Sequence, residues 1–160
     1  MNIMQKHENF NEIKGDLLLL FKEKNYDIIC HTTNCFCKMN EGISLKIAKQ
    51  FPQAFSIDKK TQEANVHKLG SFSHANTEYG KIINLYVQFK PGPHFEYSAL
   101  IKGLHRINKH YKGKHIAFPQ IGVGIAQGDW TIIRFLLYTM LPDLQVTIVY
   151  YDNGQTEMGI

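Results

Sequence analysis

The stretch HIAFPQIGVGIAQGDW, His115–Trp130, places two glycines between a predicted strand and a predicted helix. An apolar run ends at a proline, Gly122 and Gly124 flank a single residue, and an apolar helical pattern begins at Trp130. Glycines on both sides of Val123 would let successive backbone amides point into one concavity, and such arrangements bind anions. The alternative is a tight turn in which the glycines only permit positive φ. The spacing is not G-x-G-x-x-G, so the dinucleotide-binding motif does not apply.

Asp129 is the next-to-last residue of this stretch and directly precedes the helical pattern that begins at Trp130. A side-chain oxygen at that position accepts hydrogen bonds from the first free amides of a helix. We therefore predict that Asp129 caps the helix, in preference to a direct chemical role.

The hydrophobic pattern on both sides of this stretch predicts strand, strand, helix, hairpin, helix, strand, helix and strand. The predicted strands are 17–21, 26–30, 69–75, 81–89, 115–118 and 146–151, and the predicted helices are 43–51, 97–111 and 130–141. Pro52 is expected to stop the first helix. Apolar strands alternating with helices favour a three-layer α-β-α fold, α/β in class, with a mixed, mostly parallel central sheet. In such folds, ligands bind at the carboxyl ends of the strands.

The composition is that of an ordinary globular protein. The chain has 160 residues, of which 44% are hydrophobic and 20% charged, and we expect a single domain over 1–160 with a core at about 14–152. No apolar run approaches the roughly 18–20 residues that span a bilayer, and the first eleven residues do not resemble a signal peptide, so a cytoplasmic location and no membrane partner are expected. The net charge of +4 suits an anionic ligand. The lysines are either a solvated surface or a polyanion-binding patch.

The three cysteines, Cys30, Cys35 and Cys37, are odd in number and closely spaced. This pattern does not indicate a disulfide framework, and there is no second ligand pair with zinc-finger spacing. We expect reduced structural thiols and neither a metal nor a cofactor.

The other candidate loop is HTTNCFCKMNEGIS, residues 31–44. Asn34 offers a donor and an acceptor that suit vicinal sugar hydroxyls, but it is also a common turn residue. An unperturbed histidine titrates near neutrality, so His31 is a candidate for proton transfer, and its alternative role is that of a buried structural histidine. Before the first predicted strand, Asp16 could accept a hydrogen bond from an exocyclic amine or could simply belong to a turn.

Together these motifs resemble the macro domain family of ADP-ribose-binding proteins. Gly15-Asp-Leu-Leu18 is similar to the opening of the family, residues 31–44 to its first binding loop and residues 119–126 to its second. The resemblance covers residues 14–151, with the motifs in the right order. The sequences NLYVQ (residues 84–88) and GIAQGDW (residues 124–130) are most similar to the phage and bacterial branch of the family, which is described as ADP-ribose-1''-phosphate phosphatase.

The resemblance implies a role for each matching residue. Asp16 and Leu17 would contact adenine, Asn34 the distal ribose, and the two glycine loops the diphosphate. Tyr151, or alternatively Tyr150, would lie against adenine. His31, supported by Asn34, would transfer protons in phosphate removal. The residues implied to contact ADP-ribose are Asp16, Leu17, Asn34, Met39, Gly42, Ile43, Ser44, Gln88, Gln120, Ile121, Gly122, Val123, Gly124, Ile125, Ala126 and Tyr151.

Two other functions stay open beside the phosphatase. One is removal of ADP-ribose from a protein or a nucleic acid. A related branch uses a lysine and an aspartate for this, where the chain has Gln88 and Ala126, while Lys90 is expected to lie past the strand end. The other is binding without turnover, because Asn40 stands where the first loop of the family usually has its first glycine, and Glu41 adds a carboxylate near the anionic ligand. We expect Glu41 to face solvent, with a role as a base as the alternative, and the protein to be a monomer.

Overall fold

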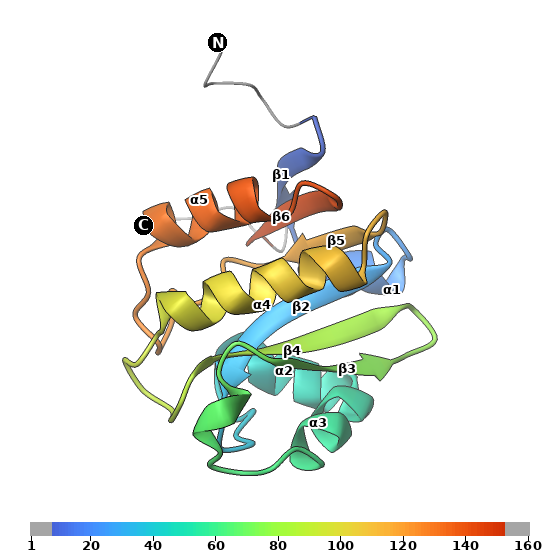
Figure 1. Cartoon of the computed structure of the whole chain (residues 1–160). Coiled ribbons are helices and arrows are strands. Elements are labelled where there is room, and N and C mark those ends of the chain that lie inside the picture. The colour runs from blue at the N-terminus through green and yellow to red at the C-terminus, as the bar shows by residue number, and fades with distance from the viewer. Residues whose placement is uncertain (1–7, 153–160) are drawn as a thin grey trace, which may run out of the picture.

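A central six-stranded sheet organises the protein, and the computed structural model describes residues 8–152. The strands lie in the order β1-β6-β5-β2-β4-β3 (Figure 1). The strands are β1 (Phe10–Gly15), β2 (Ile28–Asn34), β3 (Phe72–Asn76), β4 (Lys81–Gln88), β5 (His115–Phe118) and β6 (Gln145–Tyr151). The helices are α1 (Leu17–Lys22), α2 (Gly42–Gln50), α3 (Pro52–Lys59), η1 (Val66–Lys68), α4 (Tyr97–His110) and α5 (Trp130–Met140). All strand pairs are parallel except β3 with β4, so the predicted mixed, mostly parallel sheet is confirmed.

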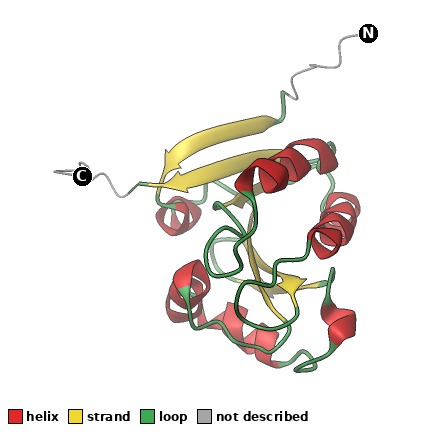
Figure 2. Ribbon diagram, turned by 90° about the vertical axis from the view of Figure 1, so that its left-hand side faces the viewer, coloured by secondary structure: helices red, strands yellow, loops and turns green. Residues whose placement is uncertain are grey.

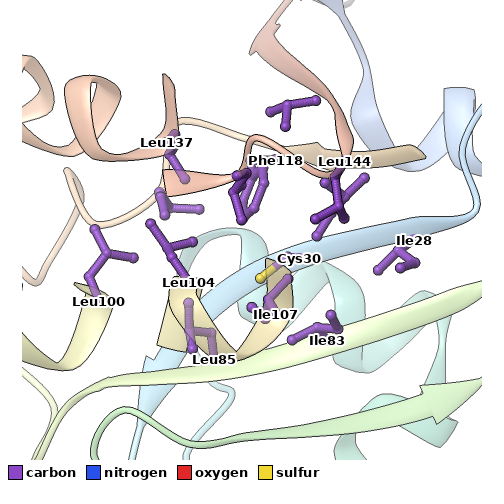
Figure 3. Close-up of a cluster of buried hydrophobic side chains, with 14 of the residues drawn as sticks. Ile28, Cys30, Ile83, Leu85, Leu100, Leu104, Ile107, Phe118, Leu137 and Leu144 are labelled. Atoms are coloured by element: carbon purple, nitrogen blue, oxygen red, sulfur yellow. The ribbon is translucent and has the colours of Figure 1, made fainter. Parts of the chain in front are cut away.

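Helices cover both faces of the sheet, which gives the three layers expected from the sequence (Figure 2). One hydrophobic cluster joins α4 and α5 to the sheet through Leu104 and Leu137, among others. Figure 3 shows these side chains meeting Phe118 and Leu85 of the strands. A second cluster joins α1, α2 and α3 to the opposite face. The two clusters pack helices against both faces of the sheet, whose carboxyl edge carries the loops that lead into α2 and α5.

The strand predicted at 17–21 is wrong, because these residues form the helix α1. Asp16 caps this helix by accepting from the amides of Leu18 (3.1 Å) and Leu19 (3.3 Å). Leu19 is 55% exposed, so the segment is not buried on both faces. A short apolar run does not distinguish a strand from a helix.

Three elements were not predicted, and one of them is the short 3₁₀ helix η1. The strand β1 mixes polar and apolar residues at the sheet edge, and its register with β6 pairs Glu12 with Ile148. The helix α3 begins at Pro52, where the sequence predicted only a stop. Proline is favoured at the first position of a helix, so one residue both ends α2 and begins α3.

The remaining predicted elements are confirmed, β5 with the predicted ends and the others with ends shifted. Strand β2 runs beyond the predicted 26–30 to Asn34, while β3 begins at Phe72 instead of 69. No helix within residues 8–152 is long and apolar enough to cross a membrane. The single-domain prediction extends over 1–160, and its two ends, 1–7 and 153–160, lie outside the described residues.

Candidate functional site

A cavity of about 630 Å³ lies at the carboxyl edge of the sheet. Asp16 follows β1, Thr32 and Gln88 lie in the last residues of β2 and β4, Pro119 follows β5, and Tyr151 ends β6. The cavity therefore lies where open α/β sheets bind ligands. The lining residues are Asp16, Leu17, Leu18, Thr32, Glu41, Gly42, Ile43, Ser44, Lys46, Gln50, Gln88, Pro119, Gln120, Ile121, Gly122, Val123, Gly124, Ile125, Ala126, Val149 and Tyr151.

The loop between β5 and α5 forms one wall of this cavity. Gly122 has φ +77°, and a β-carbon at this position would lie 2.4 Å from Cε2 of Phe95, so only glycine fits. The loop closes on itself, with the amide of Gly128 donating to the carbonyl of Gly122 at 2.6 Å. Within the described chain, the amides of residues 122–126 donate no hydrogen bond to the protein. Five successive free amides beside a cavity are suited to an anion.

The start of α2 forms the facing wall. Gly42 has φ +55°, and the N-cap residue Glu41 makes no side-chain capping bond. The first amide bonded within this turn is that of Leu45, which donates to the carbonyl of Glu41 at 3.2 Å. Among the described residues, the amides of Gly42, Ile43 and Ser44 therefore have no partner. The positive end of the helix dipole adds to their attraction for an anion.

The far end of the cavity combines one carboxylate with one aromatic ring. Asp16 uses Oδ1 to cap α1, and a carboxylate has further acceptor capacity for a ligand. Tyr151 is 65% exposed, and Nζ of Lys46 lies 4.7 Å from the centroid of its ring. Tyr150, the alternative, instead packs against Trp130 and donates to Glu12. Tyr151 is the one of the two that faces the cavity.

Three residues predicted for the site do not line the cavity: His31, Asn34 and Met39. Met39 is 3% exposed and packs in the second core cluster. Asn34 holds a turn, since its Oδ1 accepts from the amide of Phe36 at 2.9 Å and its Nδ2 donates to the carbonyl of Lys38 at 2.9 Å. Asn34 therefore has the turn role that the sequence left open.

His31 is 1% exposed, with both ring nitrogens bonded inside the protein. Nδ1 lies 2.9 Å from Oγ of Ser44, and Nε2 lies 2.6 Å from Oδ1 of Asn84. Burial lowers the pKa of His31 to about 4. A neutral, enclosed imidazole does not touch a ligand in the cavity, so direct proton transfer from His31 to a ligand does not fit this geometry.

The structure also places the other candidate residues named in the sequence analysis. Gln88 is 5% exposed and its Nε2 donates to the carbonyls of Lys90 (3.0 Å) and Gly92 (3.2 Å), while Lys90 lies past the end of β4 as expected. Glu41 is exposed at the cavity. Asp129 caps α5 by accepting from the amide of Thr131 at 2.9 Å, which confirms the predicted cap.

The sequence reasoning missed several lining residues, including Thr32, Lys46 and Gln50. Lys46 and Gln50 are four residues apart on α2, so they share a helix face with Gly42 and Ile43. That periodicity was the available signal once α2 was placed against the cavity. Thr32 had no such signal, because strand alternation alone does not reveal which face borders an opening.

The fold and the cavity define a three-layer α/β domain with unpaired backbone amides beside a cavity at the carboxyl edge of its sheet, among the described residues. A profile of the Macro domain family matches residues 30–134. An uncharacterized 17.5 kDa protein of Enterobacteria phage T4 is 40% identical over 150 residues, which are 88% of this chain and 95% of the relative. The chain belongs to the macro domain family.

Solved structures of low sequence identity share the fold. A protein of unknown function from Bacteroides thetaiotaomicron has a TM-score of 0.72 at 20% identity, covering 88% of this chain and 97% of that one. The macrodomain of Mycobacterium tuberculosis DarG has a TM-score of 0.69 at 22% identity, covering 88% of this chain and 96% of that one. Thermosipho africanus DarTG, solved in complex with ADP-ribose, has a TM-score of 0.70 at 18% identity, covering 91% of this chain and 43% of that one.

Proposed function

We propose that the cavity binds an ADP-ribose unit and that the protein removes the phosphate from ADP-ribose-1''-phosphate. The proposed binding is supported by two walls of the cavity, in which the backbone amides of residues 42–44 and 122–126 have no partner among the described residues. Free amides in a partly enclosed site favour a diphosphate, which offers several acceptor oxygens. The solved DarTG relative contains ADP-ribose, which supports this choice of ligand.

The two ends of the cavity fit the two ends of such a ligand. Asp16 can accept from the adenine amine, and Tyr151 offers its ring to the base. Gln88 and the residues of the two loops are left for the distal ribose and its phosphate. The volume of about 630 Å³ is within the usual range of roughly 300–1,000 Å³ for small-molecule sites.

Binding without turnover is the second candidate. It is favoured by the position of His31 and Asn34, neither of which lines the cavity. The lysine-dependent removal of ADP-ribose has less support, because an amide, Gln88, takes the place of the amine that would attack the sugar. These candidates differ in what the protein releases after it binds.

Calorimetry with ADP-ribose, followed by a phosphate-release assay with ADP-ribose-1''-phosphate, tests the proposal. Asp16→Ser should keep the helix cap, since serine caps as well as aspartate, but should lower ADP-ribose affinity roughly tenfold to a hundredfold because the second carboxylate oxygen is lost. Asp16→Ala should lower both affinity and stability. Equal affinity in the serine variant and the wild type would disprove the adenine contact. Binding without phosphate release would favour the second candidate.

A further inference from the structure

A chain of buried and partly buried polar side chains leads from the cavity wall into the interior. Ser44 is one of the residues that line the cavity, and its Oγ contacts Nδ1 of His31 at 2.9 Å, while Nε2 of His31 contacts Oδ1 of Asn84 at 2.6 Å. His31 and Asn84 are register partners on β2 and β4. The chain continues from Asn84 to Ser73 at 3.1 Å and from Ser73 to Tyr86 at 2.8 Å.

The partners of Asn84 determine where the protons lie. Nδ2 of Asn84 donates to the carbonyl of Ala54 at 3.0 Å, and a carbonyl can only accept, so Oδ1 is the atom that faces His31. Nε2 of His31 must then carry the hydrogen. In the neutral ring Nδ1 is left as an acceptor, and the hydroxyl of Ser44 donates to it. The carbonyl of Thr32 is a more distant acceptor for the same hydroxyl, at 3.4 Å.

We propose that Ser44 is a nucleophile, with His31 as its base and Asn84 as the group that orients the imidazole. A hydroxyl bonded to an imidazole, with a third group bonded to the other ring nitrogen, is the arrangement that activates serine in hydrolases. Ser44 is the third residue of α2, beside the free amides of Gly42 and Ile43, which can hold the oxygens of a phosphoryl group. This inference rests on the proposed function, and it gives His31 a way to act without reaching the cavity.

The reaction balances with water as the only co-reactant. Oγ of Ser44 forms a bond to the phosphorus of ADP-ribose-1''-phosphate, the bond from phosphorus to O1'' breaks, and the proton of Ser44 passes to Nδ1 of His31. The leaving O1'' takes a proton from water in the cavity. A second water then attacks the phosphoserine and breaks the bond from phosphorus to Oγ, and Oγ recovers its proton from His31. The proton that the second water releases neutralises the hydroxide left by the first.

Trapping the covalent intermediate on the wild-type protein is the direct test. The protein is mixed with ADP-ribose-1''-phosphate and quenched in acid during turnover, and peptide mass spectrometry locates any added phosphoryl group. We expect it on Ser44. Its absence from Ser44 during measurable turnover overturns the proposal, whatever the behaviour of the variants.

Matched variants supply a second test. Ser44→Ala should lower the rate of phosphate release at least about a hundredfold. Ser56→Ala makes the same change on the exposed surface of α3 and should leave the rate unchanged. Asn84→Ala should lower kcat and leave KM unchanged, because Asn84 does not line the cavity. Phosphate release by Ser44→Ala at the wild-type rate overturns the proposal.

The failure of this inference can be told apart from the failure of the proposed function. If the wild type binds ADP-ribose and releases phosphate without a phosphoserine, the function stands and the nucleophile is wrong. If it binds ADP-ribose and releases no phosphate, the nucleophile is wrong and only binding stands. If calorimetry detects no ADP-ribose binding, the proposed function fails first. If Ser44→Ala does not fold, the trapping experiment on the wild type decides.

Discussion

The buried His31 makes stability depend on pH. Burial lowers its pKa from 6.5 to about 4, so the unfolded chain binds a proton more readily than the folded protein between these values. Stability from this group is therefore complete above pH 6.5 and is lost as the pH falls towards 4. The difference between the pKa values of His31 in the unfolded and folded states corresponds to roughly 3 kcal/mol in the free energy of unfolding. About 2 kcal/mol of this is lost between pH 7 and pH 5.

Urea unfolding of the wild type and of His31→Gln at a series of pH values measures this contribution. Glutamine can still donate to Asn84 but does not titrate. Between pH 7 and pH 5, the free energy of unfolding of His31→Gln should therefore fall by about 2 kcal/mol less than that of the wild type. Burial also lowers the pKa values of His74 and His115, so the difference between the two proteins is the quantity to compare. His94→Gln, at an exposed loop position, serves as the control. Parallel pH curves for wild type and His31→Gln would refute the reasoning.

The remaining predictions concern the loop and the helix that follow β5. Gly122→Ala should lower both thermal stability and ADP-ribose affinity, because its β-carbon would meet Phe95 at 2.4 Å, whereas Gly124→Ala, with nothing within 4 Å, should keep wild-type stability in a melting experiment. Asp129→Ala should cost about 1 kcal/mol in urea unfolding through loss of the cap, and calorimetry should show unchanged affinity. Leu137→Ala, in the core, should cost roughly 3 kcal/mol by the same unfolding assay. A wild-type melting temperature for Gly122→Ala, or weaker binding by Asp129→Ala, would contradict the loop geometry.

The sequence predicted the elements whose patterns are local. The helix α4 and the strand β5 were recognised because their periodicity and end signals lie within a few residues. The glycines of the second loop were recognised for a similar reason, since Gly122 and Gly124 lie between a strand and a helix. The segment that became α1 was assigned to a strand, because five apolar residues in a row carry no period.

Contacts between residues far apart in the chain could not be predicted from the sequence. The role of His31 depends on Asn84, 53 positions away, and on Ser44 of α2. A histidine at a strand end could face either a cavity or a core, and only the register of β2 with β4 decides between them. Lys46 was missed because its position over Tyr151 joins a helix to a strand more than a hundred residues away.

An amide-resolved NMR titration with ADP-ribose tests the central claim, that the free amides of residues 42–44 and 122–126 hold the diphosphate. We predict that the largest shifts occur at these amides, including those of Gly42, Gly122 and Gly124, while residues of α4 far from the cavity shift little. No change at these amides at millimolar ADP-ribose, or the largest changes elsewhere on the protein, would contradict it.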